Sequence, residues 1–127
     1  MKKMAAFLGV AIIAAMPNLA AAASEEVVVV GVPDGCLAAP ALIAKDYDKA
    51  AHRLAPMRPD GANDPARLIN LGNAYAGLGK MKDAREAYRS ARFAPESTLL
   101  LANGEEASSR DVARRALGRL EASYAMR

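Results

Sequence analysis

An internal repeat with a period of about 34 residues is the feature that most limits how this chain can fold. When the chain is shifted by one period against itself, large apolar side chains fall on large ones and small side chains on small ones. This pattern is typical of short amphipathic helices joined by tight turns, because small residues let two helices approach closely. It predicts two helical hairpins in tandem. The matched positions are Leu37 and Leu71, Ala38 and Gly72, Tyr47 and Met81, Ala50 and Ala84, and Leu54 and Tyr88.

The second copy of this repeat, residues 71–95 (LGNAYAGLGKMKDAREAYRSARFAP), resembles a tetratricopeptide repeat. The first copy is degenerate: it keeps Tyr47, Ala50 and Leu54, but Pro40 falls within its first helix and the small-residue glycine is missing. The resemblance covers roughly residues 36–97. It is carried by Leu68, Leu71, Gly72, Tyr75, Gly79, Ala84, Tyr88 and Ala91, with Pro95 one position earlier than the usual proline of the family.

Local signals place the helices of the two hairpins. Asp64 followed by Pro65 predicts the start of a helix, and the glycines of the Gly77–Gly79 segment predict the turn to its partner. Pro40 is expected to shorten the first helix, which should begin between Cys36 and Pro40. In such a pair of hairpins, four residues of the second copy should meet in a shared interior: Leu71, Tyr75, Ala84 and Tyr88.

The N-terminal segment has the pattern of an export signal. Lys2 and Lys3 precede the uncharged run Met4–Met16, and Ala21–Ala23 provides the small residues that signal peptidase recognises. We therefore expect residues 1–23 to be a signal peptide that is cleaved before Ser24. The mature protein would be periplasmic or secreted, and free of the membrane. If the apolar stretch is taken to continue as far as Ala23, it is long enough for an uncleaved membrane anchor, which is the alternative.

Two segments outside the repeats have strand character. The run Glu25–Val32 contains four consecutive valines and favours an extended strand, which must pair with something because a buried strand cannot leave its backbone groups unsatisfied. Thr98–Ala102 is a second apolar run, followed by Asn103 and Gly104, the pair that most strongly indicates a two-residue hairpin turn. A final helix should begin at Ser108 or Ser109 and end near Tyr124. Its apolar stripe consists of Val112, Ala116, Leu117, Leu120 and Tyr124.

The sequence therefore predicts a mainly α fold with two tetratricopeptide-like hairpins, a C-terminal capping helix and a minor β element. Residues 24–35 are the expected strand and turn, and residues 36–97 the repeat domain. Within it, the degenerate copy spans about 31–64 and the clearer copy about 65–98. Residues 98–127 are the expected β-hairpin and capping helix.

Composition argues against several classes of function. One cysteine and one histidine exclude an internal disulfide framework and most zinc sites, and we expect neither a metal nor a cofactor. Cys36 and His52 are the only candidates for a nucleophile and its base, so a small enzyme that uses them is the last-ranked alternative. Aromatic residues make up 5% of the chain and no dense basic cluster occurs, which argues against nucleic-acid binding.

The resemblance also implies a binding site. In tetratricopeptide proteins the first helix of each pair lines a concave groove that holds extended peptides. By this resemblance Asn70 and Asn73 face the groove, where their amides can bind a peptide backbone or a terminal carboxylate. Arg67 and Lys45 would add charge at its edge. The carboxylate-binding pattern of the family is incomplete, because its basic residues are absent from the first copy.

From these features we expect a non-enzymatic protein- or peptide-binding module or scaffold of the bacterial cell envelope. The first alternative is a structural or assembly subunit whose apolar face is covered by a partner, with a homo-oligomer as one possibility.

Overall fold

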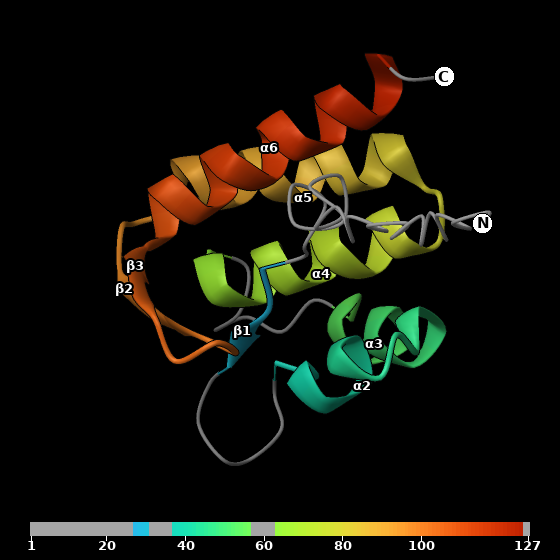
Figure 1. Cartoon of the computed structure of the whole chain (residues 1–127), viewed down its shortest axis with the longest axis horizontal. Helices are drawn as coiled ribbons and strands as arrows, with labels where there is room; N and C mark the ends of the chain where they lie inside the picture. The colour runs from blue at the N-terminus through green and yellow to red at the C-terminus, as the bar shows by residue number, and fades with distance from the viewer. Residues whose placement is uncertain (1–26, 31–36, 57–62, 126–127) are drawn as a thin grey trace, which may run out of the picture.

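The computed structural model describes residues 27–30, 37–56 and 63–125, so the expected signal peptide lies outside the described residues. Within them the fold is mainly helical, with one small antiparallel sheet, as the sequence predicts. The helices are stacked in chain order, from α2 and α3 through α4 to α5 and α6 (Figure 1). The elements are β1 (Val29–Val30), α2 (Ala39–Ile43), α3 (Tyr47–Leu54), α4 (Pro65–Gly77), α5 (Met81–Phe93), β2 (Thr98–Leu101), β3 (Glu106–Ser108) and α6 (Ser109–Ala125).

The turn between α4 and α5 has the hydrogen bonds of a Schellman motif. The backbone N–H of Gly79 donates to the carbonyl of Ala76 at 3.1 Å, and the N–H of Lys80 donates to that of Tyr75 at 2.9 Å. Gly79 has a φ of 77°, which a residue without a Cβ adopts without strain. The backbone conformation of this turn therefore favours glycine at position 79.

The turn between α2 and α3 has the same pattern, one repeat period earlier in the chain. Here the N–H of Lys45 donates to the carbonyl of Leu42 at 3.0 Å, and the N–H of Asp46 donates to that of Ala41 at 2.8 Å. Lys45 takes the place of the glycine and has a φ of 59°. The first hairpin thus reproduces the turn geometry of the second at the predicted spacing, with a strained residue in place of the glycine.

The helix starts follow the sequence signals. The Asp64 carboxylate accepts from the N–H of Ala66 at 3.0 Å, and Pro65 occupies the first turn of α4. The Asp46 carboxylate accepts from Lys49 at 3.3 Å and caps α3 in the same way. The helix α2 has only five residues and carries Pro40 in its first turn, where the missing N–H costs no hydrogen bond. The predicted shortening of the first helix is confirmed.

Two glycines of α4 allow aromatic rings to lie against the helix backbone. A Cβ on Gly72 would lie 2.5 Å from the Tyr88 ring of α5, and a Cβ on Gly77 would overlap the Tyr47 ring of α3 just as closely. Both approaches are far inside van der Waals contact, so each position requires glycine. These contacts hold α4 closely against the second helix of each hairpin.

The expected shared interior of the second copy is divided between two clusters. Tyr75 packs with Ala84 and Tyr88, together with Ala116 and Leu120 of α6. Leu71 belongs instead to the cluster formed with α2 and α3, and Tyr75 also contacts that cluster. Tyr75, Ala84 and Tyr88 meet as predicted, and Tyr75 also contacts the cluster that contains Leu71. Leu71 lies apart because it faces the first hairpin.

The C-terminal helix α6 lies along α5 and covers the second hairpin (Figure 1). Of the predicted apolar stripe, Val112, Ala116 and Leu120 are buried and Leu117 is half-buried, which confirms the stripe as far as Leu120. Ala113 is buried beside them. Two reciprocal bonds fix its start: Ser109 N–H donates to the carbonyl of Ser97 at 2.8 Å, and Ser97 N–H donates to the Ser109 hydroxyl at 3.0 Å.

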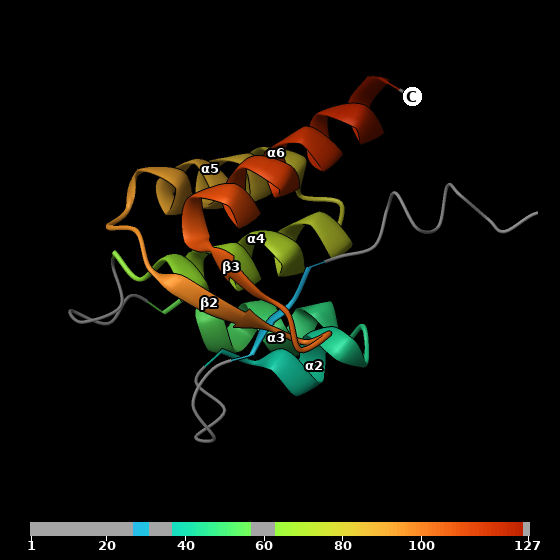
Figure 2. The same cartoon turned by 60° about the vertical axis from the view of Figure 1, so that its left-hand side comes forward.

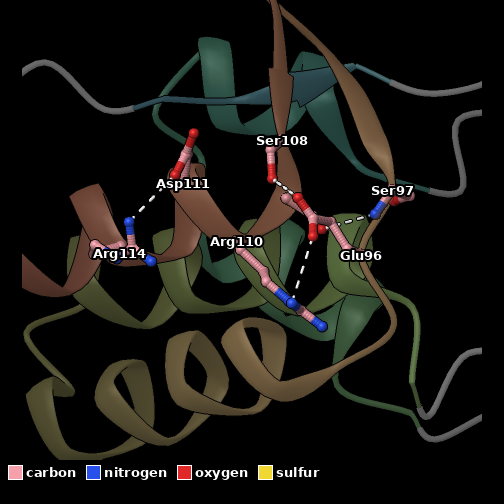
Figure 3. Close-up of polar contacts among 7 residues, drawn as sticks. Glu96, Ser97, Ser108, Arg110, Asp111 and Arg114 are labelled. Atoms are coloured by element: carbon pink, nitrogen blue, oxygen red, sulfur yellow. Dashed lines mark hydrogen bonds and ion pairs between the residues drawn. The ribbon is translucent and has the colours of Figure 1, made fainter.

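The Glu96 carboxylate adds surface contacts at the same place. It accepts from the Ser108 hydroxyl at 2.5 Å and lies 3.5 Å from Arg110 (Figure 3). Both members of the Glu96–Arg110 pair are about half exposed, so it contributes little to stability.

The sheet has the order β1-β2-β3, and the β2–β3 hairpin runs along one side of the helices beside β1 (Figure 2). In β1–β2, Val29 pairs with Leu101 and Val30 with Leu100. The expected hairpin is present, but a two-residue turn at Asn103 and Gly104 is wrong. Gly104 has a φ of 86°, Asn103 has no positive φ, and Gly104 N–H donates to the carbonyl of Leu101 at 2.9 Å. This is the three-residue loop with a glycine bulge, in which only the glycine needs a positive φ.

Candidate peptide-binding site

The central helix α4 carries Asn70 and Asn73, the two residues that the sequence predicts in an open groove. They lie one turn apart, and both are 0% exposed. The helix is buried from Pro65 to Ala74, because hairpins and sheet surround it. The prediction of an open groove is therefore wrong: the face that carries the two amides is covered by this chain's own segment Val27–Val30.

The Asn70 side chain bonds both backbone groups of Val29. The N–H of Val29 donates to Asn70 Oδ1 at 2.9 Å, and Asn70 Nδ2 donates to the carbonyl of Val29 at 2.7 Å. Asn70 Nδ2 also donates to the carbonyl of Leu37 at 2.8 Å. One amide therefore holds the segment at two points and connects it to the chain that enters α2.

The pairing of β1 with β2 explains why Val29 is available to an amide. The carbonyl of Val28 accepts from the N–H of Ala102 at 2.8 Å, so Val28 points its carbonyl toward β2. In an antiparallel pair the backbone groups of successive residues alternate between the partner strand and the open edge. Those of Val29 consequently face away from β2, and Asn70 occupies the place that a further strand would take at the open edge of β1.

The second amide extends the same contact. Asn73 Nδ2 donates to the carbonyl of Val27 at 2.9 Å, and Asn73 Oδ1 accepts from the Tyr88 hydroxyl at 2.7 Å. The Tyr88 ring is the one that lies against Gly72, so a single side chain packs α5 on α4 and orients the amide. The four polar contacts to Val27, Val29 and Tyr88 form one buried network, in which an unpaired group would be costly.

The four valines alternate between two apolar clusters. Val28 and Val30 contact the cluster that contains Leu42 and Leu71, whereas Val27 and Val29 contact the cluster that contains Ile69, Leu99 and Val112. This is the period-two alternation of a strand that is buried on both faces. Full burial of a valine is worth about 1.5 kcal/mol or more. Burial of the valine side chains on both faces therefore stabilises the bound segment in addition to the hydrogen bonds between the amides and its backbone.

The sequence suggested that Arg67 and Lys45 add charge at the edge of a groove, but the structure buries Arg67 and leaves Lys45 exposed in a turn. Arg67 is 8% exposed, and its guanidinium donates to the carbonyls of Leu54 at 2.6 Å and Pro56 at 3.3 Å. It therefore ties the end of α3 to α4. Lys45 is exposed in the turn between α2 and α3, where its backbone rather than its charge is the notable feature.

His52 and Cys36 are the residues that the sequence offered for catalysis. His52 is exposed on α3, and Cys36 lies outside the described residues. Within 27–30, 37–56 and 63–125, no group of three or more His, Cys, Asp or Glu side chains is placed to hold a metal ion.

Phe93 marks a separate surface at the end of α5. Its side chain is 76% exposed, and the Arg92 guanidinium lies 5.8 Å from the ring centroid. The ring borders a shallow hollow with Asn63, Arg89 and Pro95. The other exposed large apolar side chains, Ile43 and Leu100, belong to α2 and β2, so the three come from different elements of the described chain.

The partner of the two asparagines was not predicted from the sequence. The valine run needs a strand partner, and Asn70 and Asn73 need hydrogen-bond partners; in the structure the valine segment and the two amides bind each other. The available signal was the position of both amides on a helix that is otherwise apolar around Leu68–Ala74. Amides in such surroundings need buried hydrogen-bond partners, and an extended backbone provides them.

No helix among the described elements has the length and apolar character needed to cross a membrane. Comparison of the chain with models of known protein families, with curated proteins and with solved structures finds no match in any of the three.

Proposed function

We propose that this chain is a non-enzymatic protein-binding module of the tetratricopeptide type, exported to the bacterial cell envelope, which holds an extended apolar segment against α4. The tetratricopeptide assignment is supported by the two hairpin turns of matching geometry, at Lys45 and Gly79, and by the packing of Tyr88 on Gly72. The proposal of export is supported by the N-terminal sequence pattern of Lys2, Lys3 and Ala21–Ala23.

The observation that carries the binding proposal is the two-point contact of Asn70 with the backbone of Val29. Contacts to backbone N–H and carbonyl groups accept any extended residue except proline, which has no N–H. Selection then comes from the apolar clusters on either side, which favour small branched side chains such as valine. The ligand class is therefore an extended, β-branched apolar segment.

A labelled peptide with the sequence of residues 24–32, SEEVVVVGV, tests this proposal. In the wild-type chain its own segment competes at a high effective concentration, on the order of millimolar. Val29→Pro in the chain removes the N–H that donates to Asn70 Oδ1, and it should release the chain's own segment Val27–Val30 from α4. We expect saturable binding, measured by fluorescence anisotropy, at least tenfold tighter to the Val29→Pro chain than to wild type.

Matched controls separate this site from unspecific binding. A peptide with proline in the place of Val29 should not bind, and adding Asn70→Ala to the Val29→Pro chain should abolish binding of the original peptide. Val29→Ala keeps both backbone bonds and removes only part of the buried side chain. It should weaken binding of the chain's own segment less than Val29→Pro does, and it serves as the test if Val29→Pro does not fold. If the Val29 variants retain their helical circular dichroism and still do not bind the peptide, the binding proposal is wrong.

Export is tested separately by expressing the full chain with a C-terminal tag in a bacterium. Mass spectrometry of the periplasmic fraction should find a mature N-terminus at Ser24. Recovery of the chain with residues 1–23 intact in the cytoplasm alone would contradict the export proposal.

A further inference from the structure

A cavity of about 170 Å³ lies at the end of the helical stack where α4 turns into α5 and α6 approaches its C-terminus (Figure 1). The described segment Val27–Val30 does not line it. Protein interiors are close-packed and leave few voids larger than a water molecule, so a hollow of this size between helices marks a candidate binding site. Helices α3, α4, α5 and α6 form its walls, and the largest side chains that line it are Tyr47, Met81, Tyr88, Arg119 and Leu120.

The inner wall of this cavity is apolar and fixed in position. Tyr88, Ala116 and Leu120 line it and are buried in one cluster. The Tyr88 ring lies against Gly72, and its hydroxyl donates to Asn73 Oδ1 at 2.7 Å, which holds the ring in place. An apolar cavity of about 150 Å³ is large enough to hold a benzene ring. One six-membered ring, or a branched chain of similar size, therefore fits the volume.

The outer end of the cavity is polar and positively charged. Arg119 is half-buried there, whereas Gly77 and Ser123 are exposed, so this end opens to solvent. Among the described residues that line the cavity, only Arg119 is charged. A guanidinium has five N–H donors in a planar fork that pairs with a carboxylate through two parallel bonds, and the pair is stronger where water is partly excluded. One guanidinium balances the single charge of a carboxylate, whereas a phosphate monoester carries nearly two.

We propose that this cavity is a second binding site, which takes a small monocarboxylate whose apolar end is one ring or a short branched chain. The apolar end lies against Tyr88 and Leu120, and the carboxylate pairs with Arg119 at the opening. This site goes beyond the proposed function, because its ligand is a small molecule and its lining does not include Asn70 or Asn73. Since the ligand binds only where four helices of the folded chain meet, it should also stabilise the fold.

Phenylacetate is the probe, titrated into isotope-labelled protein that is purified after expression of the full chain. NMR should show saturable shifts at the backbone amides of Ala76, Gly77 and Ser123, with a dissociation constant of about 1 mM or lower. Phenylethanol has the same ring without the charge and should bind about tenfold more weakly. The absence of saturable shifts at these amides, or equal binding of the acid and the alcohol, overturns the proposal.

Variants of α6 test the role of the guanidinium. Arg119→Gln should raise the dissociation constant of phenylacetate about tenfold or more. Arg115→Gln is the matched control: it removes the same charge from an exposed position outside the cavity and should change the constant by about twofold at most.

Ser123→Glu places a carboxylate at the exposed opening, so it should also weaken binding, and it serves as the test if Arg119→Gln does not fold. Unchanged binding in the folded variants contradicts the proposal. N-acetylphenylalanine, which mimics the C-terminal end of a peptide, distinguishes the source of the carboxylate. If it binds more tightly than phenylacetate, a free small acid is not the ligand and the proposal is overturned.

Discussion

The side chain of Asn70 closes the open edge of β1 by bonding the N–H of Val29 at 2.9 Å and its carbonyl at 2.7 Å. Both groups point away from β2, and no exposed surface of Asn70 remains through which water could replace it. A single amide therefore does at this edge what a neighbouring strand does in a larger sheet. The stability of the N-terminal strand should depend strongly on this one residue.

Asn70→Ala is expected to lower the free energy of unfolding by about 3 kcal/mol or more. The substitution leaves the N–H and carbonyl of Val29 and the carbonyl of Leu37 without their partner, at about 1–3 kcal/mol for each buried group. Urea unfolding followed by circular dichroism measures the change. Asn63→Ala, at an exposed position, is the matched control and should fall within about 0.5 kcal/mol of wild type. Equal effects at the two positions would contradict the assigned bonds.

Tyr88→Phe tests the other end of the polar network. The ring still fits against Gly72, but Asn73 Oδ1 loses the hydroxyl that donates to it at 2.7 Å. A loss of about 1–2 kcal/mol is expected from the unpaired buried oxygen. Tyr75→Phe on the half-buried Tyr75 is the control and should change stability by less. A neutral Tyr88→Phe would mean that the hydroxyl does not hold the amide.

The sequence predicted those parts of the fold that depend on local chemistry. Asp64 with Pro65, Gly79 and the β-hairpin at Gly104 each act within a few residues, so their patterns can be recognised without the tertiary structure. The repeat period predicted which elements share a turn geometry. Even here the hairpin loop was assigned one residue too short, because Asn103 and Gly104 also suit the loop with a glycine bulge.

The site was harder to predict because its asparagines bind Val29 and Val27, which lie 41 and 46 positions away in the sequence. Asn70 and Asn73 were placed correctly on the first helix of the second hairpin, but no local pattern indicates what covers that face. The sequence indicates that the valine run and the two asparagines each need a partner, but no sequence rule indicates that they bind each other. Arg67 was also hard to predict. Its charge suggested a position at the surface, whereas the residue is buried and its guanidinium connects α4 to the end of α3.

Replacing helix glycines by alanine should lower the stability of the protein at Gly72 and Gly77 and raise it at Gly118. Gly72→Ala and Gly77→Ala should each be destabilising, since the new Cβ would meet an aromatic ring at about 2.5 Å. Gly118→Ala on α6 meets no atom within 4 Å, so it should stabilise the protein by about 0.5–1 kcal/mol through helix propensity. Thermal unfolding of the three variants measures both signs. Stabilisation by Gly72→Ala would contradict the close packing of α4 on α5.

Lys45→Gly should stabilise the first hairpin by about 1 kcal/mol, because glycine adopts a φ of 59° without the strain that lysine bears. The substitution makes this turn chemically equivalent to the one at Gly79. Lys49→Gly, on an exposed position within α3, is the control and should be destabilising by a similar amount. Chemical denaturation gives both values, and a destabilising Lys45→Gly would disprove the left-handed turn.

Hydrogen exchange at the Val29 amide, followed by NMR, tests most directly whether α4 holds the N-terminal segment. This amide should be protected nearly as strongly as the backbone amides in the middle of α4, and Asn70→Ala should remove most of the protection. Because this N–H faces away from β2, strand pairing alone would not protect it. A Val29 amide that exchanges in the wild-type chain as fast as an unfolded peptide would show that Asn70 does not hold it.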